Sequence, residues 1–199
     1  MGKIKYREEI EKIFKKTPIV STRDIQMIIS SLKRKFKLKE DYAYLLVHNL
    51  IKEGKIKRIV KGFYTIHEDP SLAVFCFKPA YIGLYDALSY HHLWEQATNT
   101  IILTTKKARA GTRRILGSTV IIHRLDKRFF FGFEPIKTNN FWIAVSDIEK
   151  TLIDLIYFKM PIDKKIKQEI FERLDKKKFR HYASRYPKKI MACLLNFLH

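Results

Sequence analysis

The hydrophobic period of this chain changes at Gly54, and this change is the feature that most constrains its fold. Before Gly54, apolar residues recur at the spacing of amphipathic helices. After it, residues 55–66 form two short basic and apolar runs that meet at Lys61-Gly62, where Gly supplies the positive φ of a tight turn. We therefore predict a helical module followed directly by a basic β-hairpin.

The first two helices of this module have clear boundaries. Tyr6, Ile10 and Phe14 share one face of a first helix, and Thr17-Pro18 ends it because proline disfavours helical geometry in the preceding residue. Residues 21–24, Ser-Thr-Arg-Asp, resemble a capping box and predict the start of a second helix.

A third helix is expected over residues 40–52, after a basic connector at 33–39. Its aliphatic residues fall on one face, which leaves Asp41, Tyr44, Leu45 and His48 on the other. Three helices followed by a hairpin are the element order of a winged helix-turn-helix, in which a helix enters the major groove and the wing reaches phosphates. We predict such a DNA-binding domain in residues 1–69.

Each part of the expected interface has its own task. We expect the wing cations to bind phosphates with release of counterions. Ser21 and Thr22 lie at the start of a helix, where backbone N–H groups can donate hydrogen bonds to a phosphate. The outer face of the third helix would contact the bases. The alternatives are a small helical domain with a solvated basic face and a winged helix that binds protein. The residues expected at DNA are Ser21, Thr22, Arg23, Lys39, Tyr42, Tyr44, His48, Lys55, Lys57, Arg58 and Lys61.

The charge of the chain agrees with a polyanionic partner. The formal net charge is +20, from 40 basic and 20 acidic residues among 199. Such an excess repels itself unless a polyanion is nearby, so nucleic acid is the first partner class to consider. Basic residues concentrate in three stretches, at 1–69, 103–137 and 159–199.

The same sequence argues against several other classes. No run of about 18 uncharged apolar residues is present and the chain opens with alternating charges, so we expect a cytoplasmic protein without a membrane partner. Cys76 and Cys193 lie far apart without ligand spacing, which predicts buried thiols rather than zinc or a disulfide. No phosphate-cradle or nucleophile-elbow motif occurs, so we predict no enzyme activity, no metal and no cofactor.

Residues 70–199 are expected to form a second, mixed α/β domain, so that the fold class is α+β. After a helix at 82–90, we predict a small, mostly antiparallel sheet and then helices. The expected strands are 100–104, 119–125, 129–133 and 141–145, with a hairpin turn at 126–128. A capping box at 146–149 begins a helix that ends before Pro161, and two basic helices are expected at 163–175 and 186–198.

Three motifs together resemble the AbiEi-type antitoxins of type IV toxin-antitoxin systems. They are Gly62-Phe63-Tyr64 at the end of the wing, the Gly-Leu-Tyr-Asp-Ala-Leu-Ser-Tyr-His-His-Leu stretch at 83–93, and the Val-Ser-Asp-Ile-Glu-Lys-Thr-Leu-Ile-Asp stretch at 145–154. The similarity is best between about 55 and 158. One departure is His92-Leu93-Trp94, where the family often continues with Gly-Leu, and this leaves the toxin-facing surface open.

That resemblance implies two roles. The N-terminal winged helix would repress its own operon by binding inverted repeats, and the following domain would counteract a nucleotidyltransferase-like toxin encoded alongside. The expected partners are therefore operator DNA and a nearby-encoded toxin, with a homodimer as a further possibility. A plain transcriptional regulator, whose second domain dimerises or senses a ligand, is the milder alternative.

A DNA nuclease with a winged-helix targeting domain is the competing class. It would need Glu134, Asp147 or Glu149 to bind a divalent metal, with Lys150 and Asp154 nearby in sequence. Carboxylates in the first turns of a helix are favoured by its dipole, so structure explains them without catalysis. His91-His92 is likewise better explained as a helix end than as a metal site.

Residues 106–114 carry five cations in nine residues, with small residues between them. This composition suits a mobile loop that follows a phosphate backbone, a solvated loop, or a contact to an acidic toxin surface. The residues of this possible second contact are Lys106, Lys107, Arg109, Arg113 and Arg114.

Overall fold

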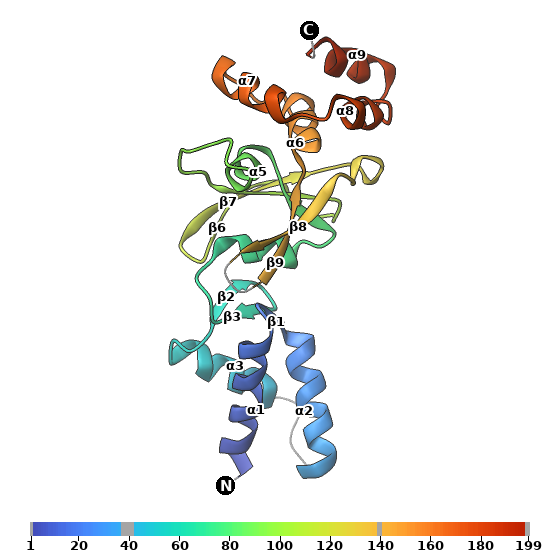
Figure 1. Ribbon diagram of the computed structural model, residues 1–199. Coiled ribbons are helices and arrows are strands. Elements are labelled where there is room, and N and C mark those ends of the chain that lie inside the picture. The colour runs from blue at the N-terminus through green and yellow to red at the C-terminus, as the bar shows by residue number, and fades with distance from the viewer. Residues whose placement is uncertain (1, 37–41, 139–140, 198–199) are drawn as a thin grey trace. The chain divides into compact units, whose positions relative to one another are not determined.

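The computed structural model describes residues 2–36, 42–138 and 141–197 (Figure 1). The chain divides into two compact units, residues 1–76 with 115–117, and residues 77–114 with 118–199. Residues 70–76 thus pack with the first unit, although the sequence placed a domain boundary near residue 70. Among the described residues, no helix combines the length and the apolar character that crossing a bilayer requires.

The first unit consists of helices and one small sheet. Its predicted first and third helices and both hairpin strands are confirmed, whereas the second helix continues to Phe36 through part of the expected connector. Residues 37–41, which include Lys39, lie outside the described part. The elements are α1 (Gly2–Lys16), β1 (Val20–Ser21), α2 (Thr22–Phe36), α3 (Tyr42–Lys52), β2 (Lys57–Val60), β3 (Phe63–Thr65), η1 (Pro70–Leu72) and α4 (Ala73–Cys76).

The sheet of this unit has the order β1-β3-β2, and both pairings are antiparallel. Gly62 turns the β2–β3 hairpin with a φ of 84°, as the sequence predicted. The Gly62 carbonyl accepts the N–H of Thr22 at 2.8 Å, which ties the hairpin turn to the start of α2. The helices and the sheet enclose one core of buried residues: Ile10, Phe14, Val20, Ile25, Ile29, Leu46, Val47, Leu50, Ile56 and Tyr64.

The second unit contains a six-stranded sheet and a group of helices. The strands predicted near 100–104, 119–125 and 141–145 and the helix that begins after residue 147 are confirmed. The elements are β4 (Ala80–Ile82), α5 (Leu84–Tyr90), β5 (Thr100–Thr104), β6 (Gly111–Ile115), β7 (Ser118–Arg124), η2 (Lys127–Phe129), β8 (Phe133–Thr138), β9 (Phe141–Ser146), α6 (Ile148–Tyr157), α7 (Lys164–Arg173), α8 (Lys176–Ala183) and α9 (Lys188–Asn196).

The expectation of a mostly antiparallel sheet is wrong. The strand order is β6-β7-β5-β4-β9-β8, and the β5–β7 and β4–β9 pairs are parallel while β4–β5 and β8–β9 are antiparallel. An apolar, β-branched run shows that a strand is present but not which strand becomes its neighbour. The edge strand β8 carries Pro135, which has no N–H to donate, and the exposed Lys137.

Five further details differ from the sequence predictions. Residues 80–82 form a strand before the expected helix, and residues 111–115 form β6 rather than a loop. A 3₁₀ turn occupies residues 127–129, so the next strand starts only at Phe133. In the described part of the chain, three helices rather than two follow residue 163, because α8 lies between the two expected ones. Cys76 is buried as predicted, whereas Cys193 is exposed.

The predicted capping box before α6 is also differently built. Asp147 is the N-cap, and its Oδ1 accepts the N–H of Lys150 at 2.7 Å. The Ser146 hydroxyl instead lies 2.7 Å from that of Thr151. The Glu149 carboxylate accepts the N–H of Asp175 at 2.9 Å, so it serves the start of α8 rather than α6.

Helix α6 is the centre of the second unit. It packs against α5, α7, α8, α9 and strand β9. Figure 1 shows α7, α8 and α9 gathered at the end of α6, away from the sheet. Leu152, Ile153 and Leu155 of this helix are fully buried and join Leu88, Leu103 and Phe179 in a single core.

Gly132 gives a test of how tightly this core is packed. A Cβ at Gly132 would lie 2.8 Å from Cε2 of Tyr182 and 2.9 Å from Cβ of Lys150, and its φ is +69°. We expect Gly132→Ala to lower the free energy of unfolding by about 2–4 kcal/mol, through backbone strain and overpacking together. Urea denaturation of the whole chain measures this change.

The matched control is Gly117→Ala, because Gly117 also has a positive φ (+80°) but nothing within 4 Å of the added Cβ. It should cost about 1 kcal/mol, from backbone strain alone. Equal destabilisation of the two variants would contradict the close packing of Gly132 against Lys150.

Candidate nucleic-acid interface

The outward face of α3 is uncharged. Tyr44 and Leu45 are each 56% exposed and His48 is exposed, whereas Leu46, Val47 and Leu50 are buried, as the helical periodicity predicted. The Tyr44 hydroxyl accepts a hydrogen bond from Nε2 of Gln26 at 3.0 Å, which ties the exposed ring to α2. Tyr42 lies in the first turn of α3.

The hairpin contributes cations to this interface, and they fall into two groups. Lys55 Nζ lies 3.0 Å from Glu11, and Lys57 forms an ion pair with Glu68. These hydrogen bonds from Lys55 and Lys57 lower the pKa of the Glu11 and Glu68 carboxyls respectively. Both lysines are therefore already partly neutralised within the protein.

Arg58 and Lys61 form the second group. Both side chains are exposed, and neither forms an ion pair with another residue in the described part of the chain. Arg58 pairs with Tyr64 in the hairpin register, next to a β-bulge before Val60, and Lys61 lies in the turn. They are the hairpin cations whose charge remains unbalanced.

Ser21 and Thr22 are occupied by internal hydrogen bonds. The Ser21 N–H donates to Oδ2 of Asp24 at 2.7 Å, and the Asp24 N–H donates to the Ser21 hydroxyl at 3.1 Å, so the predicted capping box is present. The Thr22 N–H and hydroxyl both donate to the Gly62 carbonyl, at 2.8 and 3.3 Å. These two N–H groups hold the helix start and the hairpin turn and are not presented to a phosphate; the neighbouring Arg23 is exposed.

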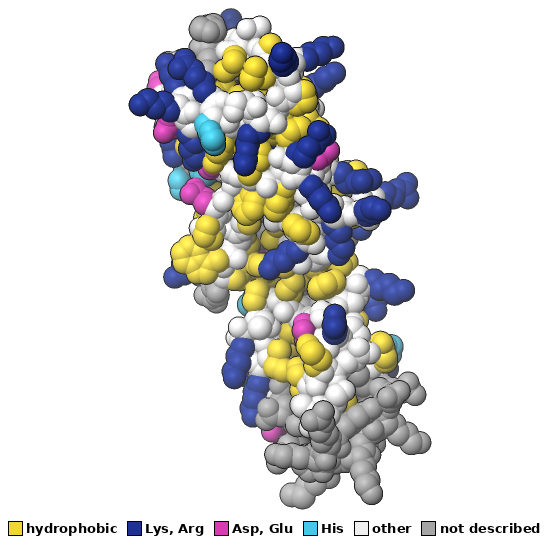
Figure 2. Space-filling model, turned by 90° about the vertical axis from the view of Figure 1, so that its right-hand side faces the viewer, with side chains coloured by type: hydrophobic (Ala, Val, Ile, Leu, Met, Phe, Trp, Pro, Cys, Tyr) yellow, Lys and Arg dark blue, Asp and Glu magenta, His cyan; other side chains and the backbone are white. Residues whose placement is uncertain are grey.

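The basic run at 106–114 is partly built into the sheet. Residues 111–115 form β6, so the expectation of one mobile loop is wrong for that part. The Arg113 guanidinium donates to the Arg109 carbonyl at 2.9 Å and lies 5.2 Å from the centre of the Phe77 ring. Lys106, Lys107, Arg109 and Arg114 are exposed. On the face drawn in Figure 2, Lys and Arg side chains are widely spread and acidic ones are few.

The carboxylates considered for a nuclease are held by lysine and tyrosine. Lys178 Nζ lies 3.1 Å from Asp147 and 2.8 Å from Glu149, and the Tyr182 hydroxyl donates to Asp147 at 3.0 Å. Burial opposes the charge of Lys178, but the hydrogen bonds to Glu149 and Asp147 raise its pKa. Glu134 lies on the edge strand β8, opposite Val145, rather than on α6. The two buried carboxylates therefore fix α8 to the start of α6.

Lys150 and Asp154, which lie one helical turn apart on α6, form a fully buried ion pair. Asp154 also accepts a hydrogen bond from the Tyr81 hydroxyl at 2.8 Å, and Lys150 donates to the Tyr186 hydroxyl at 3.3 Å. Burial lowers the pKa of Lys150 and raises that of Asp154, and each partner's charge opposes the shift of the other. Sequence reasoning missed this network, because Tyr81 and Tyr186 are distant from the pair along the chain.

The histidine pair is a helix end, as predicted. His91 is the C-cap of α5, and its Nε2 lies 2.7 Å from the Ser146 carbonyl in the buried interior. His92 is exposed with a φ of 56°. Within the described residues, no group of three or more His, Cys, Asp or Glu side chains lies together in a way that could hold a metal ion.

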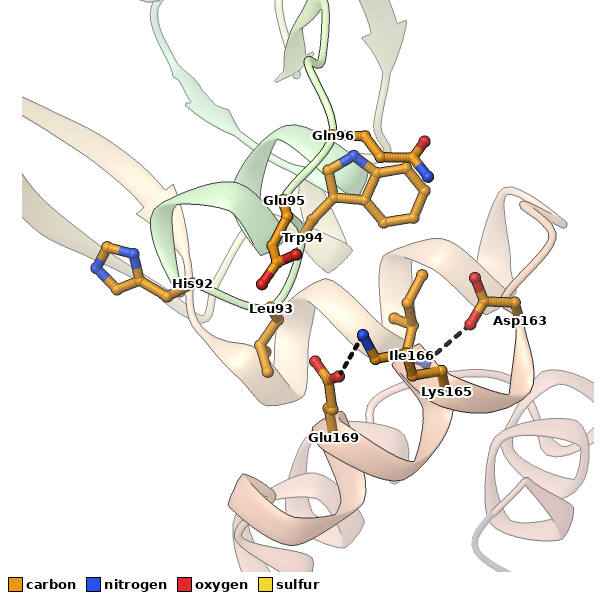
Figure 3. Close-up of a pocket in the computed structure, with 9 residues that line it drawn as sticks. All are labelled: His92, Leu93, Trp94, Glu95, Gln96, Asp163, Lys165, Ile166 and Glu169. Carbon is orange, nitrogen blue, oxygen red and sulfur yellow. Dashed lines mark hydrogen bonds and ion pairs between the residues drawn. The ribbon is translucent and has the colours of Figure 1, made fainter.

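A small pocket of about 140 Å³ lies between the segment after α5 and helix α7 (Figure 3). Glu95, Asp163 and Glu169 line it, so its charge does not suit a nucleic acid. Asp163 accepts the N–H of Ile166 at 2.8 Å as the cap of α7, and Glu169 pairs with Lys165 at 3.7 Å. The Trp94 ring packs against that of Tyr85, with 5.0 Å between the ring centres.

Comparison with known proteins shows the fold alone. No protein-family model matches this chain, and no curated protein matches it. A crystal structure of the protein RV2827C from Mycobacterium tuberculosis is similar, with a TM-score of 0.61 over 98% of this chain and 76% of that one. Its sequence is 12% identical, so the likeness extends to the mixed arrangement of helices and sheets and not to a function.

The buried ion pair leads to a stability prediction. We expect Lys150→Met to lower the free energy of unfolding by about 3–5 kcal/mol, because Asp154 would then be a buried charge without its cation. Lys150→Met combined with Asp154→Asn should be more stable than Lys150→Met alone, since the amide oxygen still accepts from Tyr81. Urea denaturation of the three variants, including Asp154→Asn, completes the cycle. Strictly additive changes would contradict the coupling.

Proposed function

We propose that the first unit is a winged helix that binds duplex DNA. The observation that carries the proposal is the pair of exposed, unbalanced cations, Arg58 and Lys61, on a hairpin that directly follows a helix with an exposed, uncharged face. An 11-residue helix fits the major groove of B-DNA, and hairpin cations suit the flanking phosphates.

The hairpin and the outer face of α3 would have different roles in DNA binding. Arg58 and Lys61 supply affinity that does not depend on base sequence, because they release counterions from phosphates. Tyr44 and His48 carry donors, acceptors and ring faces on the outer side of α3, and they suit contacts to base edges. Since the described face of α3 has no lysine or arginine before Lys52, the phosphate contacts beside this helix would come from the hairpin.

We further propose that the chain is an AbiEi-like antitoxin that represses its own operon. This step rests on the resemblance of residues 62–64, 83–93 and 145–154 to that family. In this proposal the first unit binds inverted repeats upstream of the gene, and the second unit counteracts a nucleotidyltransferase-like toxin encoded beside it.

The DNA contact is tested with Arg58→Ala combined with Lys61→Ala. Fluorescence anisotropy with the DNA upstream of the gene and with a scrambled duplex is measured over a series of salt concentrations. Removing two phosphate interactions should reduce the slope of log K against log salt by about 1.8, and near 0.1 M salt should weaken both complexes by roughly 60-fold.

Two controls separate charge from sequence recognition. Lys188→Ala with Lys189→Ala removes the same charge from exposed positions on α9 and should leave the slope unchanged. Tyr44→Ala with His48→Ala should weaken only the upstream complex, by roughly 5- to 150-fold for each base that is no longer recognised. Equal behaviour of the hairpin and α9 variants would rule out the hairpin as a DNA contact.

The antitoxin role is tested separately by co-expression with the gene next to that of this protein. We expect the neighbouring product to arrest growth when expressed alone and the full chain to restore growth. The Arg58→Ala/Lys61→Ala variant should still restore it when expressed from an unrelated promoter, because neutralisation is assigned to the second unit. A neighbouring gene that is harmless on its own would overturn the antitoxin proposal.

A further inference from the structure

A cationic groove lies in the second unit at the carboxyl ends of two parallel strands. Strands β5 and β7 pair in parallel, with Thr104 opposite Arg124, so the chain leaves both strands at the same edge of the sheet. The segments that follow the two strands, residues 105–107 and 125–127, form with Pro79 the walls of an open groove of about 560 Å³. It is lined by Pro79, Thr105, Lys106, Lys107, Arg124, Leu125, Asp126 and Lys127.

The floor of this groove is held by hydrogen bonds around Thr104. Its buried hydroxyl lies 2.7 Å from the Phe77 carbonyl and 3.0 Å from that of Pro79, and it accepts the Lys106 N–H at 2.9 Å. The Thr104 carbonyl accepts the N–H of Leu125 at 2.9 Å. Both segments are thus fixed to the same residue, so the groove is preformed.

Among the described residues that line the groove, one is acidic, and it is already neutralised. Asp126 caps the turn at 127–129 by accepting the Arg128 N–H at 2.9 Å, and the Arg128 guanidinium binds the same carboxylate at 2.9 Å. The hydrogen bond from the Arg128 side chain lowers the pKa of Asp126 to about 2. Four cations, Lys106, Lys107, Arg124 and Lys127, therefore set the charge of the groove.

We propose that this groove binds the phosphodiester backbone of a nucleic acid. The cations lie where the chain leaves the parallel strands β5 and β7, on segments that the hydrogen bonds around Thr104 hold side by side. The four cations come from two separate segments, residues 106–107 and 124–127, and several single charges in one groove suit the repeated single charges of a backbone. The exposed ring of Pro79 offers apolar surface suited to a sugar.

This inference rests on the proposed function, because it assumes the same class of ligand, a nucleic acid. It assigns a second contact to that ligand, in the other unit. Arg124 and Lys127 were not among the residues that the sequence predicted at a nucleic acid. Both are exposed, and neither forms an ion pair with another described residue. Their substitution therefore removes charge without opening the core.

The experiment compares three full-length variants for binding to a scrambled duplex over a series of salt concentrations. Arg124→Ala with Lys127→Ala should reduce the slope of log K against log salt by about 1.8 and weaken binding roughly 60-fold near 0.1 M salt. Lys176→Ala with Lys177→Ala, exposed on α8, removes the same charge and should leave the slope unchanged. Thermal unfolding checks that both variants are folded.

The third variant, Arg58→Ala with Lys61→Ala, keeps the two proposals distinguishable. A reduced slope in the groove variant alone would support the groove and contradict the hairpin contact, and the reverse result would overturn the groove. Equal slopes in the groove and α8 variants would also overturn it, because net charge alone would then explain the effect.

Competition defines the ligand. A DNA oligonucleotide should displace the labelled duplex from wild type, whereas inorganic phosphate, ATP and polyglutamate at equal charge should not. Saturable binding of phosphate or ATP that is abolished in the groove variant would indicate a small anion site instead. Displacement by polyglutamate as effective as by DNA would indicate an acidic protein partner. Either result would overturn the proposal of a nucleic-acid backbone.

Discussion

The ion pair between Lys150 and Asp154 is the interaction on which the second unit depends. It lies on α6, its carboxylate is bound by Tyr81 of β4, and its ammonium is bound by Tyr186 after α8. Strand, central helix and C-terminal helices thus meet at two charges that are fully buried. Buried charges are tolerated only with such partners, so the network fixes which elements can pack together.

The first unit is organised by a weaker, neutral connection. The Gly62 carbonyl at the hairpin turn accepts both donors of Thr22 at the start of α2. The same residues that begin the helix therefore hold the turn in place, and Lys61 beside it is positioned by backbone contacts. This explains why Ser21 and Thr22, which the sequence suggested for phosphate binding, have an architectural task instead.

Local patterns in the sequence predicted local structure well. The helices at 2–16 and 148–157, the turn at Gly62 and the outward face of α3 follow from periodicity, proline and glycine, which act over a few residues. The parallel pairing of strands such as β5 and β7 was not predicted, because it depends on the packing of the complete sheet and not on the residues of either strand alone. The sequence also did not show that Lys55 and Lys57 are paired with carboxylates, because their partners, Glu11 and Glu68, lie elsewhere along the chain.

The β8 edge of the large sheet has a consequence for the protein at high concentration. Strand β8 presents Pro135, which cannot donate a hydrogen bond, and the charged side chain of Lys137. An incoming strand would find an interrupted ladder and would have to desolvate an ammonium group. This edge is therefore a poor template for fibril growth, and a chain so rich in apolar β-strand sequence is protected there against edge-to-edge polymerisation.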